Sequence, residues 1–323
     1  MKLATIIPNW NGQDYLAACI DSLLKQTIEH TIVVVENGSE DASDEILAGY
    51  GNKIVILKQQ KNLGFAGGVN VGIKYAIDNN YDFVALFNND AIADKDWLKQ
   101  MLSSFNKSPD IMIATPAILK ADKKHLDALG TSYSIFGAPF PRLRNQQFDE
   151  ISAEPEYVFG GAGGASLYKV ELFKEIGLFD EDFFAYYEED DINFRTQLMG
   201  HKVITVPSSK VYHAIGGTSS KIRGFTAKQT AQNFWYLYTK NMPGWLYFKY
   251  LPLASFWYIL MFINRTINGL FVYFMKGFFT SLFNLPKTIT KRRYIQKNRQ
   301  VSTKQINEIL YHRTPPKSLR SRT

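Results

Sequence analysis

The sequence predicts an α/β protein in which helices flank a mostly parallel β-sheet. Over about the first 110 residues, short apolar runs alternate with segments whose apolar residues recur at helical spacing. Such alternation is typical of a parallel sheet that is covered on both faces. Three of the apolar runs end abruptly in polar residues, and the segment after residue 240 is rich in aromatic and basic residues. These observations predict a ligand site at one sheet edge and a helical extension at the C-terminal end.

The expected elements follow one another along the chain. Strands are predicted at residues 2–8, 30–39, 53–59 and 82–90, and helices at 14–27, 41–50, 62–78 and 94–105. Residues 111–220 are less regular, with strand-like runs at 201–207 and 209–213 and a loop within 140–150. We expect no independent second domain before residue 240.

Composition restricts the class of protein. Cys19 is the only cysteine, so no disulfide can form within the chain, and the short apolar run at the N-terminus does not predict a signal peptide. Residues 243–323 carry 14 Lys and Arg against one acid, which gives +13, whereas residues 1–242 carry 23 against 29 acids, which gives −6. A basic tail suits nucleic acid, an anionic membrane surface or simple solubility. The 14 aromatic residues at 243–283 favour the membrane over nucleic acid.

Polar residues at the ends of three predicted strands form the first candidate site. They are Asn9-Trp10-Asn11, Glu36-Asn37-Gly38-Ser39 and Asn88-Asn89-Asp90. Ligands of parallel sheets bind at the carboxyl ends of the strands, and polar residues needed only for solubility have no reason to gather there. The oxygens of the third group suit Mg²⁺ or Mn²⁺, although an Asx-rich turn explains the same residues.

Two further stretches each have a structural and a functional interpretation. The glycines of residues 62–72 either let the backbone approach an anion or let a helix pack tightly. Their spacing is not the dinucleotide fingerprint, and the stretch lacks the Lys-Ser/Thr pair of a phosphate loop. His213 is a structural residue unless it lies beside Asp90, in which case the two suit one metal ion.

Four consecutive acids, Glu188 to Asp191, lie within an aromatic frame at residues 183–195. On a helix, Glu188 and Asp191 share one face, while Glu189 lies to one side. Crowding raises the pKa of at least one carboxyl, and a carboxylate with a moderately raised pKa is a workable general base. Arg195 could keep one neighbour ionised. A solvated acidic turn is the alternative interpretation.

Together these stretches resemble the nucleotide-sugar glycosyltransferases of family 2, which have the Rossmann-like GT-A fold. The pattern is most similar to rhamnosyltransferase-like and galactofuranosyltransferase-like members. The resemblance covers most of residues 1–220 and rests on six motifs in the family's order: IIPNWNG, VVVENGSEDAS, NLGFAGGVNVG, LFNND, GGAGGASLYKVELFKEIGLFDEDFFAYYEEDDINFR and VYHAIGGTS. Glu36 stands where Asp is usual, and Asn88 stands where the first Asp of the metal motif often lies.

The resemblance implies an inverting transferase that moves a rhamnose-like sugar from a dTDP- or UDP-sugar to a saccharide acceptor in cell-surface polysaccharide synthesis. Mg²⁺ or Mn²⁺, held by Asp90 and His213, would neutralise the leaving diphosphate. Glu189 aligns with the family's base, Glu188 and Asp191 would bind or orient the acceptor, and Asp190 would face solvent. The implied donor-binding residues are Pro8, Asn9, Asn11, Glu36, Asn37, Ser39, Asn62, Gly64, Asn70, Asn88 and Asn89.

The resemblance also implies a catalytic domain at 1–240, with a donor half of about 1–110 and an acceptor half of about 111–240. The extension at 241–313 contains apolar runs at 251–263 and 269–283, which are shorter than the about 20 residues of a spanning helix. Basic flanks and aromatic density predict helices in the membrane interface. A polyprenyl-linked acceptor would place the protein at the cytoplasmic face of the cell membrane, as a peripheral or monotopic protein. A helical extension packed on the catalytic domain and a spanning pair are the alternatives, and residues 314–323 are expected to be disordered.

Two other functions fit the sequence less well. A sugar-1-phosphate nucleotidyltransferase needs basic residues directly after the first strand, where PNWNGQDY has none. A catalytically inert transferase fold could act as a membrane-bound binding module. Such a module would not need LFNND, His213 and the acidic run, all of which are present.

Overall fold

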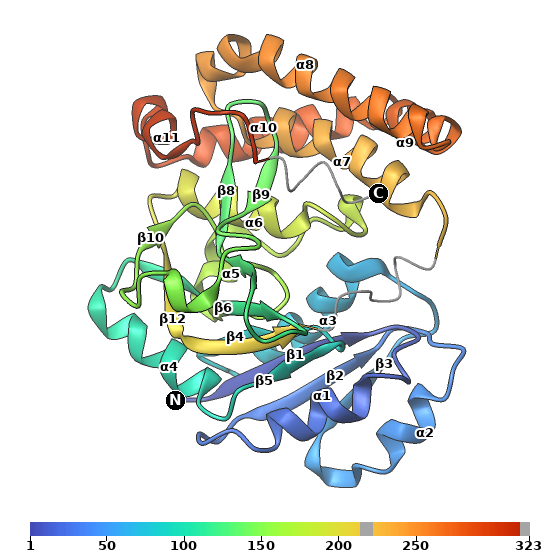
Figure 1. Ribbon diagram of the computed structural model, residues 1–323, viewed down its shortest axis with the longest axis vertical. Coiled ribbons are helices and arrows are strands. Elements are labelled where there is room, and N and C mark those ends of the chain that lie inside the picture. The colour runs from blue at the N-terminus through green and yellow to red at the C-terminus, as the bar shows by residue number, and fades with distance from the viewer. Residues whose placement is uncertain (214–221, 317–323) are drawn as a thin grey trace.

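The computed structural model describes residues 1–213 and 222–316. A sheet with flanking helices forms one end of the molecule, and the C-terminal helices form the other (Figure 1). The strand order in the main sheet is β10-β12-β6-β11-β4-β1-β2-β3, with β5 paired to β12 and β7 paired to β6. The end of the last predicted motif, after His213, and most of the predicted tail lie outside the described residues.

The first four strands of the chain pair in parallel, as predicted. They are β1 (Leu3–Asn9), β2 (Thr31–Glu36), β3 (Val55–Lys58) and β4 (Phe83–Leu86). The predicted helices are α1 (Leu16–Leu23), α2 (Ser43–Ala48), α3 (Gly64–Asp78) and α4 (Trp97–Ser104). Asn9 lies in register with Glu36, so the polar ends of β1 and β2 are side by side.

Antiparallel pairing makes the second half of the sheet mixed. Its strands are β5 (Ala91–Ala93), β6 (Ile111–Lys120), β7 (Leu126–Leu129), β10 (Tyr157–Val158), β11 (Leu167–Lys169) and β12 (Lys202–His213). Strand β11 lies antiparallel between β4 and β6, so the parallel run ends there. The two strand-like runs at 201–207 and 209–213 both lie in β12, in which a register shift between Val206 and Lys210 interrupts the pairing with β6 without ending the strand.

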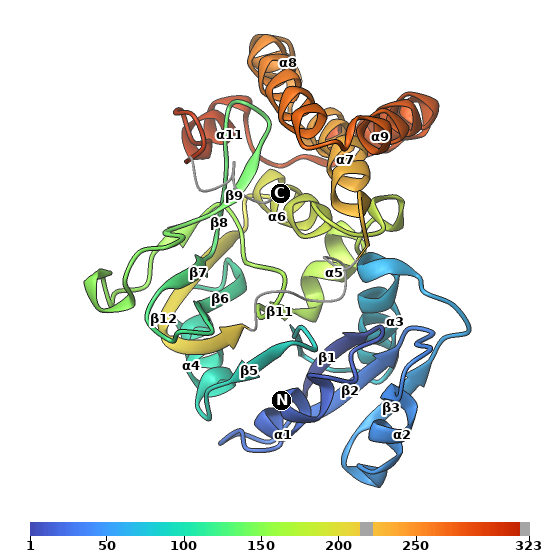
Figure 2. The same cartoon turned by 45° about the vertical axis from the view of Figure 1, so that its right-hand side comes forward.

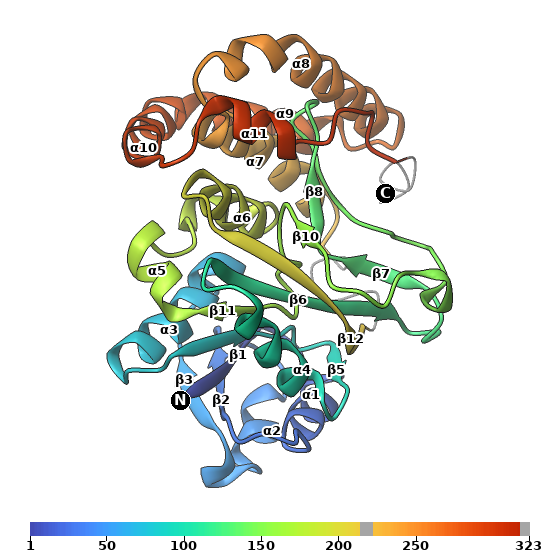
Figure 3. The same ribbon diagram turned by 90° about the vertical axis from the view of Figure 1, so that its left-hand side faces the viewer.

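The predicted loop at 140–150 is partly ordered into regular structure. Strands β8 (Thr131–Tyr133) and β9 (Pro139–Pro141) pair as a hairpin that rises from the sheet towards the C-terminal helices (Figure 3). The short helices η2 (Phe105–Lys107), η3 (Phe148–Glu150) and η4 (Glu181–Phe183) and the helices α5 (Val170–Ile176) and α6 (Glu188–Leu198) complete this half, whereas η1 (Gly51–Lys53) precedes β3 in the first half. Helix α6 contains the whole acidic run.

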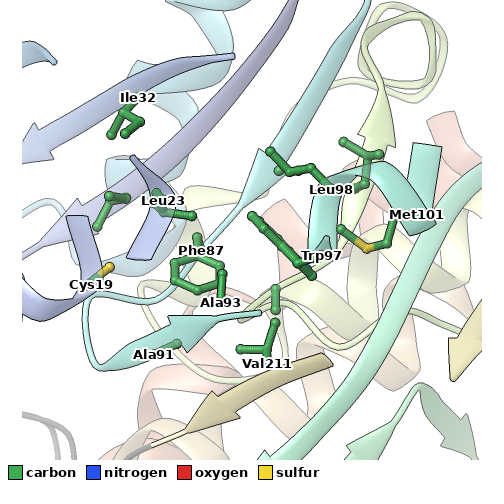
Figure 4. Packing of buried hydrophobic residues seen from close by; sticks show 14 of the residues in the cluster. Cys19, Leu23, Ile32, Phe87, Ala91, Ala93, Trp97, Leu98, Met101 and Val211 are labelled. Carbon is green, nitrogen blue, oxygen red and sulfur yellow. The ribbon is translucent and has the colours of Figure 1, made fainter. Parts of the chain in front are cut away.

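A buried apolar cluster lies beneath the turn that carries Asn88-Asn89-Asp90. Figure 4 shows Phe87 beside Trp97, and their ring centroids are 4.7 Å apart. Both side chains are fully buried, and Val211 of β12 belongs to the same cluster. Large buried aromatic side chains dominate core energetics. The turn after β4 therefore begins on a well-packed base.

The C-terminal helices form a layer of their own. They are α7 (Phe225–Asn241), α8 (Gly244–Ile267), α9 (Phe271–Phe283), α10 (Leu285–Asn298) and α11 (Thr303–Ile309). Helix α7 packs against α6, α8, α9 and α10, and a Cβ on Gly277 of α9 would lie 2.2 Å from the Lys228 backbone oxygen. A second buried cluster joins Phe194 of α6 to Phe234 and Tyr258. The predicted boundary at residue 240 thus falls within α7, a helix shared by both parts.

Helix α8 is longer than the predicted run at 251–263. It extends over 24 residues and is long and apolar enough to cross a membrane, by length and composition alone, with 28% of its most apolar window buried in the protein. Helices α8 and α9 lie at the end of the molecule farthest from α1 and α2 (Figure 2). Phe248 and Phe283 are 72% and 83% exposed. The extension therefore packs through one face and presents apolar side chains on the other.

Candidate active site

The polar ends of the central strands form one hydrogen-bonded cluster. Asn9 Nδ2 donates to Glu36 Oε2 over 2.7 Å, and the Ser39 amide donates to Glu36 Oε1 over 2.8 Å. Asn89 Nδ2 donates to Asn9 Oδ1 over 2.8 Å, and the Asn11 amide donates to Ser39 Oγ over 2.9 Å. The predicted gathering of these residues at one sheet edge is confirmed. We call them the strand-end cluster: Asn9, Asn11, Glu36, Ser39 and Asn89.

The loop before α3 is shaped by two asparagines. Asn37 Oδ1 accepts from the Leu63 amide over 3.0 Å, and Asn37 Nδ2 donates to Gly64 O over 3.1 Å. Asn62 Oδ1 accepts from the Gly64 amide over 2.8 Å. Gly64 has a φ of 74°, and a Cβ there would lie 2.4 Å from Phe184 O. The glycine at this position is therefore required by tight packing.

Pro8 and Asn70 contact neighbouring elements of the fold. A Cβ on Gly68 of α3 would lie 3.4 Å from Pro8 Cβ, so Pro8 packs beside that helix. Asn70 is buried, accepts from the Phe179 amide over 3.0 Å and donates to Phe179 O and Glu181 Oε1 over 2.9 and 3.0 Å. The side-chain amide of Asn70 thus ties α3 to the loop after α5, and its donor-binding role stays a prediction.

Asp90 and His213 lie side by side, as the sequence required of a joint site. Strands β5 and β12 pair Ala91 with His213, and His213 Nε2 lies 3.0 Å from Asp90 Oδ1. His213 Nδ1 lies 3.6 Å from Asp127 Oδ2. Burial lowers the pKa of His213, but the carboxylates of Asp127 and Asp90 outweigh it and raise that pKa to about 9. The imidazole is therefore protonated at neutral pH between two carboxylates.

This pair fits a divalent ion whose remaining ligands come from a substrate. Among residues 1–213 and 222–316, no group of three or more His, Cys, Asp or Glu is arranged to hold a metal ion. Mg²⁺ is commonly held by one or two carboxylates together with substrate phosphates, so Asp90 with His213 is a sufficient protein contribution. Ligation needs a neutral imidazole, and metal binding here would displace the proton from His213.

A glycine loop at residues 160–164 brings the metal motif and the acidic run together. A Cβ on Gly163 would lie 2.7 Å from Glu189 Oε2, and a Cβ on Gly164 would lie 2.8 Å from Asn88 Nδ2. The backbone N–H of Asn88 also donates to Gly164 O over 2.9 Å. Two successive loop residues therefore touch the end of β4 and the start of α6. Larger side chains in this loop would separate the two halves of the site.

The four acids of α6 have different surroundings. Glu188 and Asp190 are 3% and 6% exposed, whereas Glu189 is half-buried. Burial raises the pKa of Glu188 and of Asp190 well above the ordinary values, and the nearby charge of Glu189 adds to both shifts. The prediction that Asp190 faces solvent is wrong. Helix α6 is covered on two sides, since Ile192 packs in the sheet-side core and Phe194 in the helical core.

Asp191 has no exposed surface. Its carboxylate accepts from Arg195 Nε over 2.9 Å, from Lys240 Nζ over 2.8 Å and from Asn241 Nδ2 over 2.8 Å. Burial raises the pKa of Asp191, but Lys240 and Arg195 outweigh it, so that pKa lies below its ordinary value. Of the two predicted roles, orienting the acceptor site fits this position and direct acceptor contact does not.

Sequence reasoning missed several residues at or near the site. A shallow surface pocket beside the strand-end cluster is lined by Trp10 and Asn11, which belong to the first predicted site, and by residues that were not singled out from the sequence: Gln13, Asp14, Glu40, Asp41 and Ile222. At this pocket the backbone N–H of Gln13 donates to Asp41 Oδ2 over 2.9 Å. Nothing in the sequence marked Asp127 or Lys240, since each reaches the site only through the packing of β7 or α7.

The close approach at Gly163 generates a stability prediction. Gly163→Ala would place a methyl group against both Oε2 and Cβ of Glu189, at 2.7 and 2.9 Å. Overpacking of this kind should lower the free energy of unfolding by about 1–3 kcal/mol, measured by urea denaturation. Gly49→Ala is the matched control, because its nearest neighbour is 3.3 Å away and its φ is −65°. Equal unfolding free energies for the two variants would contradict the contact.

Comparisons with known proteins identify the family of the chain. The family model described as "Glycosyl transferase family 2" matches residues 4–177. The dTDP-rhamnosyl transferase RfbF of Shigella flexneri is 26% identical over 193 residues, a match that spans 60% of this chain and 62% of that protein. The uncharacterized glycosyltransferase RT0329 of Rickettsia typhi is 27% identical over 296 residues, spanning 91% of this chain and 86% of that protein.

The solved structures show the same fold. The mannosyltransferase PcManGT from Pyrobaculum calidifontis, in complex with GDP-Man and Mn²⁺, superposes with a TM-score of 0.54 at 14% identity and covers 88% of this chain and 87% of its own. At this identity the similarity concerns the fold alone, which is the GT-A arrangement. The family model covers more than half of the 323 residues. The chain therefore belongs to glycosyl transferase family 2.

Proposed function

We propose that this protein transfers a sugar from a nucleotide-diphosphate sugar to an acceptor hydroxyl with inversion of configuration. The observation that carries the proposal is the glycine loop, in which Gly163 lies against Glu189 and the next residue, Gly164, lies against Asn88, just after β4. A carboxylate is thereby placed beside strand ends that suit a nucleotide donor. A rhamnose-like sugar on dTDP or UDP is the proposed donor, because the relative RfbF is named a dTDP-rhamnosyl transferase.

The strand-end cluster is the proposed nucleoside site. Glu36 is only 3% exposed, and hydrogen bonds from Asn9 and Ser39 fix its two oxygens. The pocket beside it offers the indole of Trp10 and the amide of Asn11. An aromatic face suits a nucleobase, since base–aromatic stacking is worth about 1–3 kcal/mol. Rigid strand ends thus form one side of the proposed nucleoside site, and its other side is open.

Asp90 and His213 are the proposed ligands of Mg²⁺ or Mn²⁺. When bound, the ion would offset the charge that develops on the leaving diphosphate. The support is the 3.0 Å distance between Asp90 Oδ1 and His213 Nε2. Asp90 directly follows Asn88 and Asn89 in the chain. PcManGT was solved with Mn²⁺ and GDP-Man together.

Glu189 is the proposed general base. It alone among the four acids keeps its side chain partly exposed, so an acceptor hydroxyl can reach it. Glu189 would take the hydroxyl proton as the acceptor oxygen attacks the anomeric carbon, while the bond from that carbon to the diphosphate breaks on the opposite side. Glu188 is a candidate acceptor contact, because its buried Oε2 has no hydrogen-bond partner among the described residues.

Glu189→Gln tests this assignment. The amide cannot accept the proton, so transfer should fall about 10²- to 10⁴-fold, whereas the dissociation constant for dTDP or UDP should stay within about twofold. The assay would offer dTDP-rhamnose and several UDP-sugars and would measure nucleotide release with an oligosaccharide acceptor. Glu154→Gln, on the exposed segment before β10, is the control. Wild-type turnover in Glu189→Gln would remove Glu189 from the role, and no binding of any donor would favour the inert binding module.

Asp90→Asn tests the metal site. Loss of the carboxylate should raise the Mn²⁺ concentration for half-maximal activity at least about tenfold, because one of two protein ligands is weakened. Asp78→Asn, exposed at the end of α3, should leave that concentration unchanged. Full wild-type activity in excess EDTA would contradict a metal requirement.

A peripheral or monotopic position at the cytoplasmic face of the membrane is also proposed, with a saccharide on a polyprenyl carrier as acceptor. The support is the apolar outer face of α8 and α9, where Phe248, Phe256 and Phe279 are 72%, 52% and 50% exposed. No Asp or Glu occurs between residues 243 and 307, so nothing on these helices repels an anionic surface. Exposed aromatic residues with a basic surround favour an interface position.

Membrane attachment is best tested in the full-length chain, since a chain cut at residue 240 would lose the helices that pack on α7. Phe248→Glu combined with Phe283→Glu places two charges on the outer face and should abolish flotation with vesicles that contain anionic lipid. Tyr157→Glu is the control, because Tyr157 is 55% exposed on β10, away from the helical layer. Equal flotation of both variants would contradict attachment through α8 and α9.

A further inference from the structure

A row of polar side chains on α7 holds the loop at residues 183–187, directly before the acidic run. Gln229 Nε2 and Asn233 Nδ2 donate to Phe183 O over 3.1 and 2.8 Å. Asn233 Nδ2 also donates to Tyr186 O over 2.7 Å. Gln229 and Asn233 are both buried. The carbonyl groups of this loop are therefore bound by side chains of a helix 46 to 50 residues further along the chain.

The same loop is held in an unfavourable backbone conformation. Phe184, Tyr186 and Tyr187 have φ angles of 61°, 68° and 71°. Positive φ is unfavourable for a residue with a side chain and persists only where the surroundings determine it. Here the side-chain amides of Gln229 and Asn233 on α7 hold the loop in that conformation. The direction in which α6 leaves the loop thus depends on where α7 lies.

Lys240, in the last turn of α7, fixes α6 itself. It is 4% exposed, and its Nζ lies 2.8 Å from Asp191 Oδ2 and 2.6 Å from Asp180 Oδ2. Asp191 belongs to the first turn of α6, and Asp180 precedes η4. One ammonium group therefore joins the two segments that flank the 183–187 loop. Asn241 adds a bond to the second oxygen of Asp191 over 2.8 Å.

The network continues into the helical extension. Lys291 Nζ of α10 lies 2.5 Å from Asp180 Oδ1 and 2.6 Å from Asp182 Oδ2. Burial lowers the pKa of Lys291, but its bonds to Asp180 and Asp182 outweigh it and raise that pKa. Lys287, one turn before Lys291 on α10, pairs with Asp182. The acids that flank the loop are thus bound from α7 on one side and from α10 on the other.

We propose that Lys240 is a positioning residue for sugar transfer. By bridging Asp180 and Asp191, it sets the start of α6 so that Glu189, two positions before Asp191, faces the glycine loop. Lys291 supports the same bridge from the helical extension, which gives the C-terminal helices a part in the chemistry as well as in attachment. The inference rests on the proposed role of Glu189 as base.

The physical reason to assign geometry rather than bulk stability is the weak net contribution of buried ion pairs. Apolar replacement of both partners of a buried pair is often as stable, whereas removal of one partner leaves an uncompensated buried charge and lowers stability. The kcat of Lys240→Met is therefore compared only for folded protein. Without Lys240, the carboxylates of Asp180 and Asp191 would repel each other and move apart. A displacement of about 1 Å at a catalytic group costs on the order of 100-fold in rate.

The experiment compares turnover with nucleotide affinity. Lys240→Met should lower kcat about 10- to 100-fold. The KM for the donor sugar and the dissociation constant for dTDP or UDP should stay within about twofold, because the hydrogen bonds that define the strand-end cluster join its own residues and not α7. Asp191→Asn combined with Lys240→Met should lose little more than Lys240→Met alone, since the two groups act as a unit. Lys99→Met, exposed on α4, is the control.

Lys291→Met provides a second, milder variant, because Lys291 is 31% exposed and lies at the outer end of the network. It should lower kcat about threefold or more with unchanged donor KM. Wild-type kcat in a folded Lys240→Met protein overturns the inference, as does a parallel loss of nucleotide affinity and kcat. If Lys240→Met does not fold, wild-type kcat in Lys291→Met overturns it.

Glu189→Gln, assayed in parallel, tests the proposed base separately from the proposed positioning residue. Normal turnover in Glu189→Gln removes the proposed base, whatever Lys240→Met does. An inactive Glu189→Gln protein together with an unimpaired Lys240→Met protein removes only the positioning role.

Discussion

The buried carboxylate of Asp191 is the charge around which the acceptor side of the molecule is arranged. A carboxylate removed from water must be paired and hydrogen-bonded, or it will take up a proton. Arg195, Lys240 and Asn241 meet that requirement from two different helices. Satisfying this one group therefore fixes α6 against α7. Because Glu189 lies two positions earlier, the same requirement sets the direction of the partly exposed acid.

The two halves of the site are built by different physical means. Hydrogen bonds between parallel strands place Asn9 beside Glu36 on the donor side, and the register of the sheet leaves little freedom there. The acceptor side has no such frame. It depends on a strained loop, on buried ion pairs and on glycines that allow close contact at residues 163 and 164. A rigid set of strand ends, the proposed nucleoside site, thus contrasts with an acid whose position depends on long-range contacts.

The basic C-terminal segment serves two purposes that net charge alone does not separate. Lys287 and Lys291 pair with Asp182 and Asp180, which precede the loop at residues 183–187. Arg292 Nη1 donates to Thr239 O and Met242 O over 2.6 Å each. Part of the positive charge is therefore used inside the protein. The aromatic side chains on the outer face of α8 and α9 have no comparable internal use, and a membrane interface would explain their exposure.

The sequence by itself determined the parallel first half of the sheet and its polar strand ends, because these follow from local apolar patterns. It left open whether His213 lies beside Asp90, which the pairing of β5 with β12 decided. It did not determine that β12 is continuous or that α8 reaches 24 residues, since Pro207 and Asn264 interrupt the pattern but not the element. Only the tertiary structure decided which acids of α6 are buried. Burial of Asp190 and the pairing of Lys240 arise from a helix packed some 50 residues later in the chain, and no local pattern records that contact.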